Sequence, residues 1–535
     1  MRRPTTPSFL RDLVAEPGAG RVLTAAIVSI AAAGFNPLVY SPGFPSVQAA
    51  IRAKPEVEVF LLLATLVSAG LLFVGGIFGD TDGRRGILLG ALGALVVAGV
   101  VGVVIPDGPL FLVGRLAGSA AASMVVPFAL ALVATTYRGI ARATAIGLVY
   151  SAYGLGQGAG PVLLTIFGPG GSTWPAFAAS AIAAAVAIWI VRPRAPDLPA
   201  VARNQRSYVV ATATWAFAIV IVVAALIGLG NGPTSVVRLY LIGLGLAMGI
   251  GYLAWERRGR GHPRVTALRV DRRPVSVAVA AGLVIGFAQA APLFQLPLFF
   301  RIVLSYGTLA TTLATVPFVL ALVLAGPVAG RLLVRFSPRH LVAIGLAGVG
   351  LGNLVAALAL GANTPYVAIV LSFVLIGVGF VVATTVRTAI IFASVPRGLP
   401  ATAAALNQAS LQVGGSIGLV VVTVVVTRFA IDAYSNALAG LDPAQREAAV
   451  AAFGDVLNAI GTPAMGQIAL TISQADIAAY SSAFTDGLRY SLGLTGLIAL
   501  IAAPIAWAAL GPRDPLGTVF DHADERAEVA APAAG

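Results

Sequence analysis

The sequence predicts an all-α polytopic membrane protein, and three observations lead to this fold class. The 535-residue chain is 58% hydrophobic and only 10% charged, whereas a soluble domain carries about 25% charged residues. Apolar runs long enough to cross about 30 Å of hydrocarbon recur along the chain. Arginines gather in short clusters between these runs, so membrane topology explains the net charge of +13 better than nucleic-acid binding does.

Fourteen apolar runs define the expected spans in chain order. They cover residues 22–44, 59–79, 86–105, 109–134, 143–167, 174–191, 208–230, 239–255, 275–300, 307–330, 341–361, 365–386, 402–427 and 490–510. The first run has about 23 residues, whereas the apolar part of a signal peptide has about 7–15, so we expect a retained span. The eighth and tenth spans are the weakest expectations because they are rich in glycine and either short or broken by proline.

Positive charge predicts the orientation of these spans. With the N-terminus inside, most of the 34 Lys and Arg residues fall in cytoplasmic segments, so both termini are expected to be cytoplasmic. An acidic extracellular excursion is expected before the last span, with stretches such as "PAQREAAVAAFGDVLNAI" forming short amphipathic helices on the outer face. The predicted domains are a cytoplasmic tail (1–21), a first six-helix bundle (22–191), a linker with two extra spans (192–273), a second six-helix bundle (274–511) that includes the excursion (429–487), and a disordered cytoplasmic tail (512–535).

Residue usage excludes several kinds of site. The chain has no cysteine, so disulfides, thiolate metal sites and cysteine catalysis are excluded. Lys54 is the only lysine, so no Walker A lysine exists to hold nucleotide phosphates. His262, His340 and His522 fall in loops or the tail, and the expected spans contain no carboxylate. We therefore expect no catalytic residues, no metal, no cofactor, and neither nucleotide nor nucleic acid as a partner.

The loop after the second expected span, "GGIFGDTDGRRG", concentrates charge at the mouth of a membrane helix. Topology alone explains Arg84 and Arg85, and the loop would then be a positive-inside loop with incidental acids. Asp80 does not help topology, but its carboxylate can accept hydrogen bonds from a helix N-terminus while the arginines balance its charge. With Gly76 and Gly83 permitting close approach, the loop would be a latch that holds while the inner mouth is shut.

The second half of the chain contains an echo of this loop. In "GRLLVRFSPRH", Gly330 is followed by Val334, Ser337 and Arg339 at the spacings that follow Gly76. Paired repeats of this sort are typical of secondary transporters. The echo lacks the aspartate, and glycine and arginine are common in this chain.

Arg115, early in the fourth expected span, is the one charged residue that this mapping places inside a span. Burying a lone guanidinium in hydrocarbon costs at least about 2.5–3.5 kcal/mol, so we expect it to face the bundle interior and find a partner. It is either a structural arginine near the outer interface or a residue that contacts substrate or couples protons.

The fifth expected span, "AIGLVYSAYGLGQGAGPVLL", places Gly147, Gly156 and Gly160 before Pro161. Glycines spaced by four let another helix approach closely, and proline removes a backbone donor and permits a bend. Taken alone, this pattern also fits ordinary small-residue packing.

Polar uncharged side chains recur at mid-span in both halves. Any one of them could be a satisfied helix–helix hydrogen bond, but as a set they predict a central cavity that takes substrate. Pro292 and Pro297 predict a bend of the ninth span around that cavity. The candidates are Asn36, Tyr40, Gln157, Gln289, Gln295, Asn407 and Gln408, with Ser41 and Gln412 beside them.

These motifs resemble those of the major facilitator superfamily. "GGIFGDTDGRRG" is similar to its loop signature between spans two and three, and "GLVYSAYGLGQGAGP" to the fifth-span signature of its antiporters. Arg115 with Pro127 resembles the fourth-span signature. "LPLFFRIVLSYG" and "GPVAGRLLVRFSPRH" resemble the ninth and tenth spans of the fourteen-span drug:proton antiporter branch, so the resemblance covers about residues 20–510.

The resemblance implies two six-helix bundles plus two extra helices, which transport by alternating access driven by a proton gradient. It implies that Asp80 latches against the start of the thirteenth span, near Pro400–Thr402, and that Arg115 is linked to proton coupling. It also implies that the Gly147, Gly156 and Gly160-Pro161 pattern serves as the inter-bundle hinge.

The chain departs from the family pattern at several positions. Asn36 stands where the branch often has an aspartate, Gly118 and Ser119 replace a glutamine and a glycine, and Leu164 replaces a glycine. With no carboxylate in the expected spans, a cationic drug would lack a buried counter-charge. Neutral or anionic amphiphiles are therefore the expected substrates.

We therefore expect a secondary active exporter of hydrophobic or amphiphilic small molecules in a bacterial plasma membrane, working in antiport with protons. Two alternatives stay open on the sequence. One is a dedicated exporter of an endogenous lipid, glycolipid or antibiotic. The other is a non-transporting receptor or scaffold that binds its partner through residues 429–487.

Overall fold

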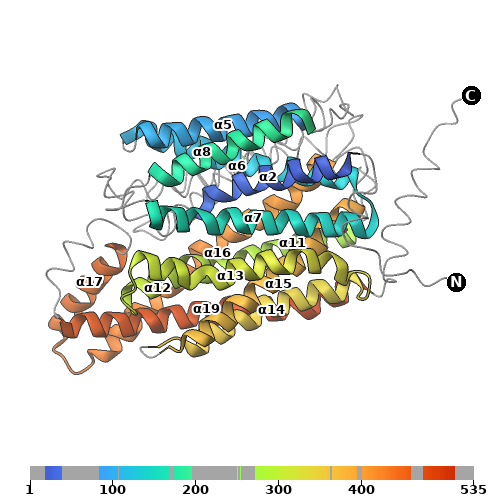
Figure 1. Cartoon of the computed structure of the whole chain (residues 1–535). Helices are drawn as coiled ribbons and strands as arrows, with labels where there is room; N and C mark the ends of the chain where they lie inside the picture. The colour runs from blue at the N-terminus through green and yellow to red at the C-terminus, as the bar shows by residue number, and fades with distance from the viewer. Residues whose placement is uncertain are drawn as a thin grey trace, which may run out of the picture.

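The computed structural model of the chain is all-helical wherever it is described (Figure 1). The second and seventh expected spans and the C-terminal tail lie outside the described residues, as do most of the eighth span and most of the N-terminal tail. The described residues are 18–38, 84–105, 108–167, 174–194, 272–361, 364–394, 400–459 and 474–511, together with Ala247, Ile250 and Ala254.

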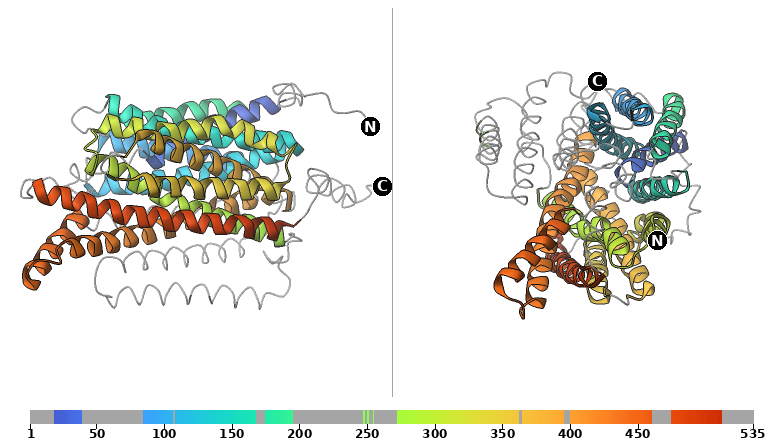
Figure 2. Two further views of the ribbon diagram at one scale, coloured as in Figure 1. Left: turned by 90° about the horizontal axis from the view of Figure 1, so that it is seen from below. Right: turned by 90° about the vertical axis from the view of Figure 1, so that its left-hand side faces the viewer.

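The helices of the first half pack mainly with one another. The described ones are α2 (Ala19–Leu38), α5 (Arg84–Val104), α6 (Gly108–Thr136), α7 (Gly139–Phe167) and α8 (Trp174–Arg194). Helix α2 contacts α6, α7 and α8, while α5 contacts α6 and α8. In Figures 1 and 2 these helices form one group, with their axes roughly parallel.

The helices of the second half form a neighbouring group. They are α11 (Arg272–Ala290), η3 (Ala291–Gln295), α12 (Leu296–Ile302), α13 (Thr308–Leu332), α14 (Pro338–Ala359), α15 (Tyr366–Ser394), α16 (Pro400–Ala437), α17 (Pro443–Ala459) and α19 (Gln474–Leu510). The two groups meet where α7 packs on α13 and α15, and where α6 packs on α16.

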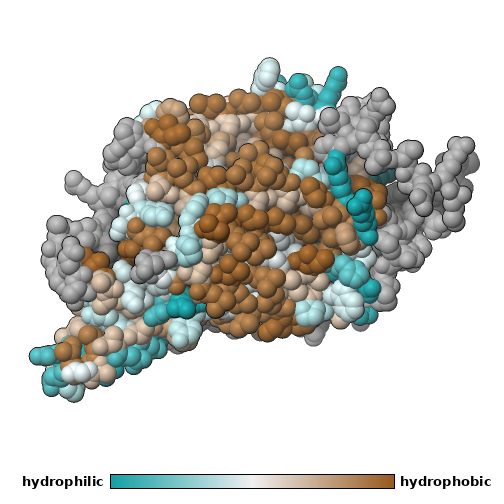
Figure 3. Space-filling model, turned by 60° about the horizontal axis from the view of Figure 1, so that its bottom comes forward, coloured by the Kyte–Doolittle hydropathy of each residue, from teal (hydrophilic) through white to brown (hydrophobic). Residues whose placement is uncertain are grey.

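The outer surface of the two groups is apolar, as a lipid-facing surface requires. Within the described residues, nine helical segments are long and apolar enough to cross a membrane. Large apolar side chains on them point outward, among them Leu358, Val367 and Trp189, each at least 75% exposed. Figure 3 shows hydrophobic residues covering the middle of the molecule and hydrophilic ones gathering toward its ends.

The ninth expected span has an irregular backbone at its prolines. It runs as one candidate span from Arg273 to Ile302, but the stretch Ala291–Gln295 is π-helical, with Pro292 near its start. A proline lacks the N–H that would bond the carbonyl four residues earlier, so an α-helix tends to deform there. The helix is thus irregular at the place where the prolines predicted a bend, and the bend around a cavity stays a prediction.

The excursion before the last span stands off the end of the helix bundle (Figures 1 and 2). The expected helix at "PAQREAAVAAFGDVLNAI" is present as α17. The other described parts of the excursion belong to long helices, because α16 continues unbroken to Ala437 and α19 begins at Gln474. Tyr434, Phe453 and Tyr480 stack between these three helices with ring centroids 4.6–5.0 Å apart, which gives the excursion a small core of its own.

Candidate functional site

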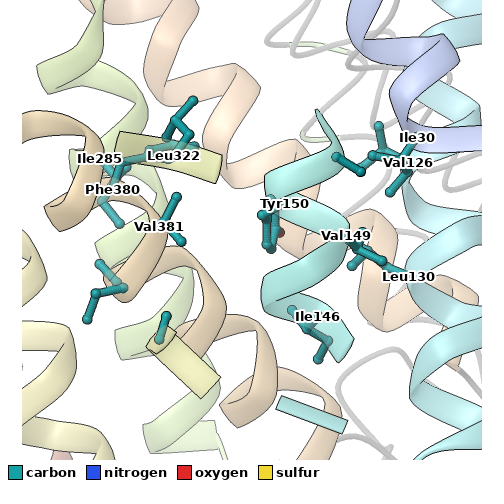
Figure 4. Packing of buried hydrophobic residues seen from close by; sticks show 14 of the residues in the cluster. Ile30, Val126, Leu130, Ile146, Val149, Tyr150, Ile285, Leu322, Phe380 and Val381 are labelled. Carbon is teal, nitrogen blue, oxygen red and sulfur yellow. The ribbon is translucent and has the colours of Figure 1, made fainter. Parts of the chain in front are cut away.

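Three buried polar side chains join the two halves, and we call Tyr150, Thr388 and Asn407 the interface cluster. Tyr150 on α7 accepts a hydrogen bond from Asn407 Nδ2 on α16 at 2.9 Å, and its hydroxyl lies 3.1 Å from Thr388 Oγ1 on α15. Thr388 Oγ1 lies 3.0 Å from Asn407 Oδ1, which closes the triangle. All three are at most 4% exposed, and Figure 4 shows Tyr150 between apolar residues of both halves. Buried polar groups are costly when unpaired, so the cluster stabilises this arrangement of the halves.

Directly behind the interface cluster lies the fully buried guanidinium of Arg387, on α15. Its Nη2 donates to the carbonyl of Asn407 at 2.8 Å. Its Nη1 donates to Ser410 Oγ at 2.9 Å and to the carbonyl of Ala278 at 3.3 Å. Gly282 on α11 provides the room, because a Cβ there would overlap this guanidinium. Arg387 therefore ties α11, α15 and α16 together next to the contact with α7.

The expectation that Arg115 is the one charged residue within a span is wrong. The twelfth span was expected to end at residue 386, but α15 continues to Ser394 and carries Arg387 into the interior. The available signal was the apolar stretch Ile390–Phe392 after the arginine, which continues the helical pattern for another turn. Arg115 itself lies on α6, and its side chain is outside the described residues.

Small residues let α7 and α13 pack closely, and we call this contact the glycine seam. A Cβ at Gly147 would overlap the carbonyl of Gly326, and a Cβ at Gly154 would lie 2.9 Å from Leu322 Cβ. Nearer the start of α7, Gly330 leaves room for the backbone of Thr144. Residue numbers rise along α7 as they fall along α13, so the two helices run antiparallel with their backbones in near contact.

Within the seam, Ser151 bonds a carbonyl that a proline has left free. Pro327 has no N–H, so the carbonyl of Val323, four residues earlier, has no α-helical donor. Ser151 Oγ on α7 donates to this carbonyl at 2.9 Å. Its other acceptors are farther away, at 3.2 Å for its own Gly147 carbonyl and 3.4 Å for Leu322. The proline on one half thus creates the acceptor for a hydrogen bond from the other half.

The chain matches the Major Facilitator Superfamily over residues 22–419. It belongs to that superfamily. Among curated proteins it is 24% identical to the multidrug efflux pump LfrA of Mycolicibacterium smegmatis over 83% of this chain and 87% of LfrA. It is 29% identical to a tetracycline resistance determinant of Streptomyces rimosus over 39% of this chain and 60% of that protein. The solved proton:xylose symporter XylE shares the fold, with a TM-score of 0.60 and 14% identity over 94% of this chain and 98% of XylE.

Membership makes the chain a transporter, and its apolar helices and bacterial relatives make it a multi-pass protein of the bacterial inner membrane. The described residues contain no group of three His, Cys, Asp or Glu side chains that could hold a metal ion. The number of spans and their orientation stay predictions.

Two residues of the predicted latch, Arg84 and Arg85, lie among the described residues of this major facilitator protein. Gly76, Asp80 and Gly83 lie outside them, and Arg84 begins α5 with its side chain outside them. Arg85 donates to the carbonyl of Arg192 in the last turn of α8, at 2.6 Å. Cations stabilise helix C-termini in this way, so Arg85 has a structural partner within the first half.

The predicted hinge residues of α7 face different neighbours. Gly147 lies in the glycine seam, whereas Gly156 packs on the carbonyl of Ala31 on α2, inside the first half. Gly160 is buried, and the side chain of Pro161 lies outside the described residues. The hinge role of these four residues stays a prediction.

The predicted cavity residues are brought together only in part. Asn407 belongs to the interface cluster, and Gln412 Nε2 donates to Ser123 Oγ on α6 at 3.2 Å, which is a further contact between the halves. Gln289 and Gln408 are buried, each with one amide atom that has no partner. For the rest, Gln295 is buried, Gln157 is half-buried on α7, and Tyr40 and the side chain of Asn36 lie outside the described residues.

Proposed function

We propose that this chain is a secondary active exporter of amphiphilic small molecules that works by alternating access in antiport with protons. The observation that carries the proposal is the interface cluster. Two of its side-chain hydrogen bonds join the halves, and the third links Thr388 to Asn407 within the second half. Buried apolar residues of both halves lie on either side of it (Figure 4). Such a contact can open without disrupting either half, as a rocking mechanism requires.

The proposed substrate class is neutral or anionic. Arg387 is a fully buried cation, and within the described residues its bonding partners are all neutral. A buried positive charge disfavours a cationic molecule nearby and favours a negative one. The names of the relatives, a multidrug efflux pump and a tetracycline resistance determinant, support export of drug-like molecules.

The proposed gate is the loop that contains Asp80, and the proposed coupling residue is Arg115. The echo supports the gate. Gly330, the counterpart of Gly76, packs against Ala143 and Thr144 near the start of α7, the fifth span of the opposite half. The proposed Asp80 latch is the matching contact: the end of the second span of the first half would meet the start of α16, the fifth span of the second bundle.

Transport in liposomes tests this function. The purified protein is reconstituted in phosphatidylcholine liposomes, and the transport of three probes is compared. The probes are 1-pyrenesulfonate, its neutral sulfonamide, and a pyrene that carries a trimethylammonium group. We expect the anionic or neutral probe to move faster when a pH gradient is imposed, and the cationic probe to move least. Absence of transport for all three probes would overturn the proposal. Transport without any response to the gradient would overturn its proton coupling.

Tyr150→Phe tests the role of the interface cluster. The substitution keeps the ring but removes a hydroxyl that serves two contacts, each worth about 0.5–1.5 kcal/mol. We expect a drop in probe turnover of about five- to tenfold, with little change in thermal stability, because the state with joined halves becomes less populated. Tyr490→Phe, at a ring that is 57% exposed, is the control. Equal turnover in the two variants would contradict the role.

A further inference from the structure

Among the residues that the structure describes, Arg387 has no negatively charged partner. Helices α7, α11 and α15 contain no Asp or Glu. On α16 the one acid is Asp432, and at 1.5 Å per residue it lies about 37 Å along the helix from Asn407. In the described part of the chain, the guanidinium is therefore held by two carbonyls and a hydroxyl.

The hydrogen bonds of this guanidinium are also incomplete. Its Nε is buried without a partner, although guanidinium groups normally use this edge to bind carboxylates and similar anions in a fork. One turn earlier on α15, the hydroxyls of Thr384 and Thr385 are buried without partners too. Thr384 lies three residues before Arg387 and is its neighbour on the helix surface, whereas Thr385, two residues before it, does not face it. The Nε of the cation and the Thr384 hydroxyl are thus two unused hydrogen-bond donors on one side of α15. This is a donor set suited to anionic oxygens.

The place of these donors connects them to the interface between the halves. Thr388, which contacts Tyr150, follows Arg387 directly and lies one turn after Thr384 on α15. Asn407 bonds Tyr150 through its amide and Arg387 through its carbonyl. If α7 moved away from α15 and α16, Tyr150 would no longer cover this side of the second half.

We propose that Arg387, with the hydroxyl of Thr384, forms an anion subsite that binds the acidic group of an amphiphilic substrate when the halves separate. The ligand class is a singly charged sulfonate, carboxylate or enolate on an apolar body. This inference rests on the proposed exporter function and narrows its substrate class.

The test compares 1-pyrenesulfonate with its neutral sulfonamide, which has the same ring without the charge. Equilibrium binding to purified protein is followed by pyrene fluorescence, and transport is followed in phosphatidylcholine liposomes, which contain no anionic headgroup. We expect Arg387→Gln to weaken the sulfonate about tenfold or more, as loss of a charge-assisted hydrogen bond does, and to leave the sulfonamide unchanged. Arg387→Lys, which keeps the charge, should retain the preference for the sulfonate. Arg428→Gln, at an exposed arginine of α16, is the control.

Thr384→Val tests the subsite without relying on the folding of Arg387 variants. Its hydroxyl has no partner, so a purely structural role predicts no loss or a slight gain in stability. The anion subsite predicts weaker binding of the sulfonate alone, by about five- to tenfold.

Equal effects on sulfonate and sulfonamide, or no preference for the sulfonate in the unaltered protein, would overturn the subsite. If the protein binds the sulfonate in an Arg387-dependent manner but transports neither probe, the exporter function fails and the subsite stands.

Discussion

Two prolines of the second half each free a backbone carbonyl, and in both cases a polar side chain from a neighbouring helix binds it. Pro292 leaves the carbonyl of Ala288 without its α-helical donor, and Asn353 Nδ2 on α14 donates to it at 3.3 Å. Pro327 does the same to Val323, whose carbonyl accepts from Ser151 on α7. The first contact lies inside one half, and the second joins the two halves.

The two donors differ in how many bonds they can make at once. The Asn353 amide has two protons and also donates to its own Val349 carbonyl at 2.9 Å, so it serves both acceptors together. The Ser151 hydroxyl has one proton, so it can donate either to the Val323 carbonyl or to the carbonyl of Gly147 on its own helix, which is 3.2 Å away. If the halves part, the serine can turn to Gly147 and stay bonded. We call the hydrogen bond from Asn353 to Ala288 the permanent tie, and the hydrogen bond from Ser151 to Val323, which can be released, the releasable tie.

The largest effect in this comparison should come from closing the space in the glycine seam. A Cβ at residue 326 would overlap Ser151 Oγ and the Gly147 carbonyl. Gly326→Ala therefore forces α7 and α13 apart, and overpacking of this kind costs about 1–3 kcal/mol. We expect probe transport to fall more than tenfold. Gly90→Ala, at a helical glycine with open space around it, should transport normally. Normal transport by both variants would contradict close packing of the seam.

The next largest effect should follow removal of the permanent tie. Asn353 is fully buried, and Asn353→Ala leaves the Ala288 carbonyl without a donor from this side chain. An unpaired buried acceptor costs about 1–3 kcal/mol, so the melting temperature of the purified protein should fall by several degrees. The distance between the halves should stay unchanged, because α14 and α11 both belong to the second half. If Asn353→Ala changed the distance between the halves and left the melting temperature unchanged, the roles given to the two ties would be reversed.

The sequence predicted the helical membrane fold because apolar composition and span length decide it, and the superfamily followed from local motifs. The interface cluster was harder to predict. Asn407 was a candidate because its side chain is polar in an apolar run, but Tyr150 and Thr388 are common in membrane helices and have no distinguishing spacing. Arg387 was missed because a charge near the end of a run looks like a loop residue. Which side chains meet across the halves depends on helix rotation, and one-dimensional patterns do not fix rotation between distant segments.

The smallest effect should come from the releasable tie. Ser151→Ala removes a hydrogen bond worth about 1 kcal/mol, which corresponds to about a fivefold shift toward separated halves with little loss of thermal stability. Because the chain has no cysteine, cysteines introduced at Leu155 and Leu320 can be spin-labelled uniquely. Both residues are about half exposed, on α7 and α13. The population of the longer distance should rise about fivefold in Ser151→Ala, and an unchanged distribution would contradict the tie.

Pro327→Ala shows whether the proline is the reason for that tie. Alanine restores the N–H that bonds the Val323 carbonyl within α13, so the carbonyl no longer depends on Ser151. In this background, Ser151→Ala should change the distance distribution much less than it does alone. The difference between the two backgrounds is the coupling between Ser151 and Pro327. If the two substitutions acted independently, the serine would be holding the halves together by packing alone, and the freed carbonyl would have no part in joining them.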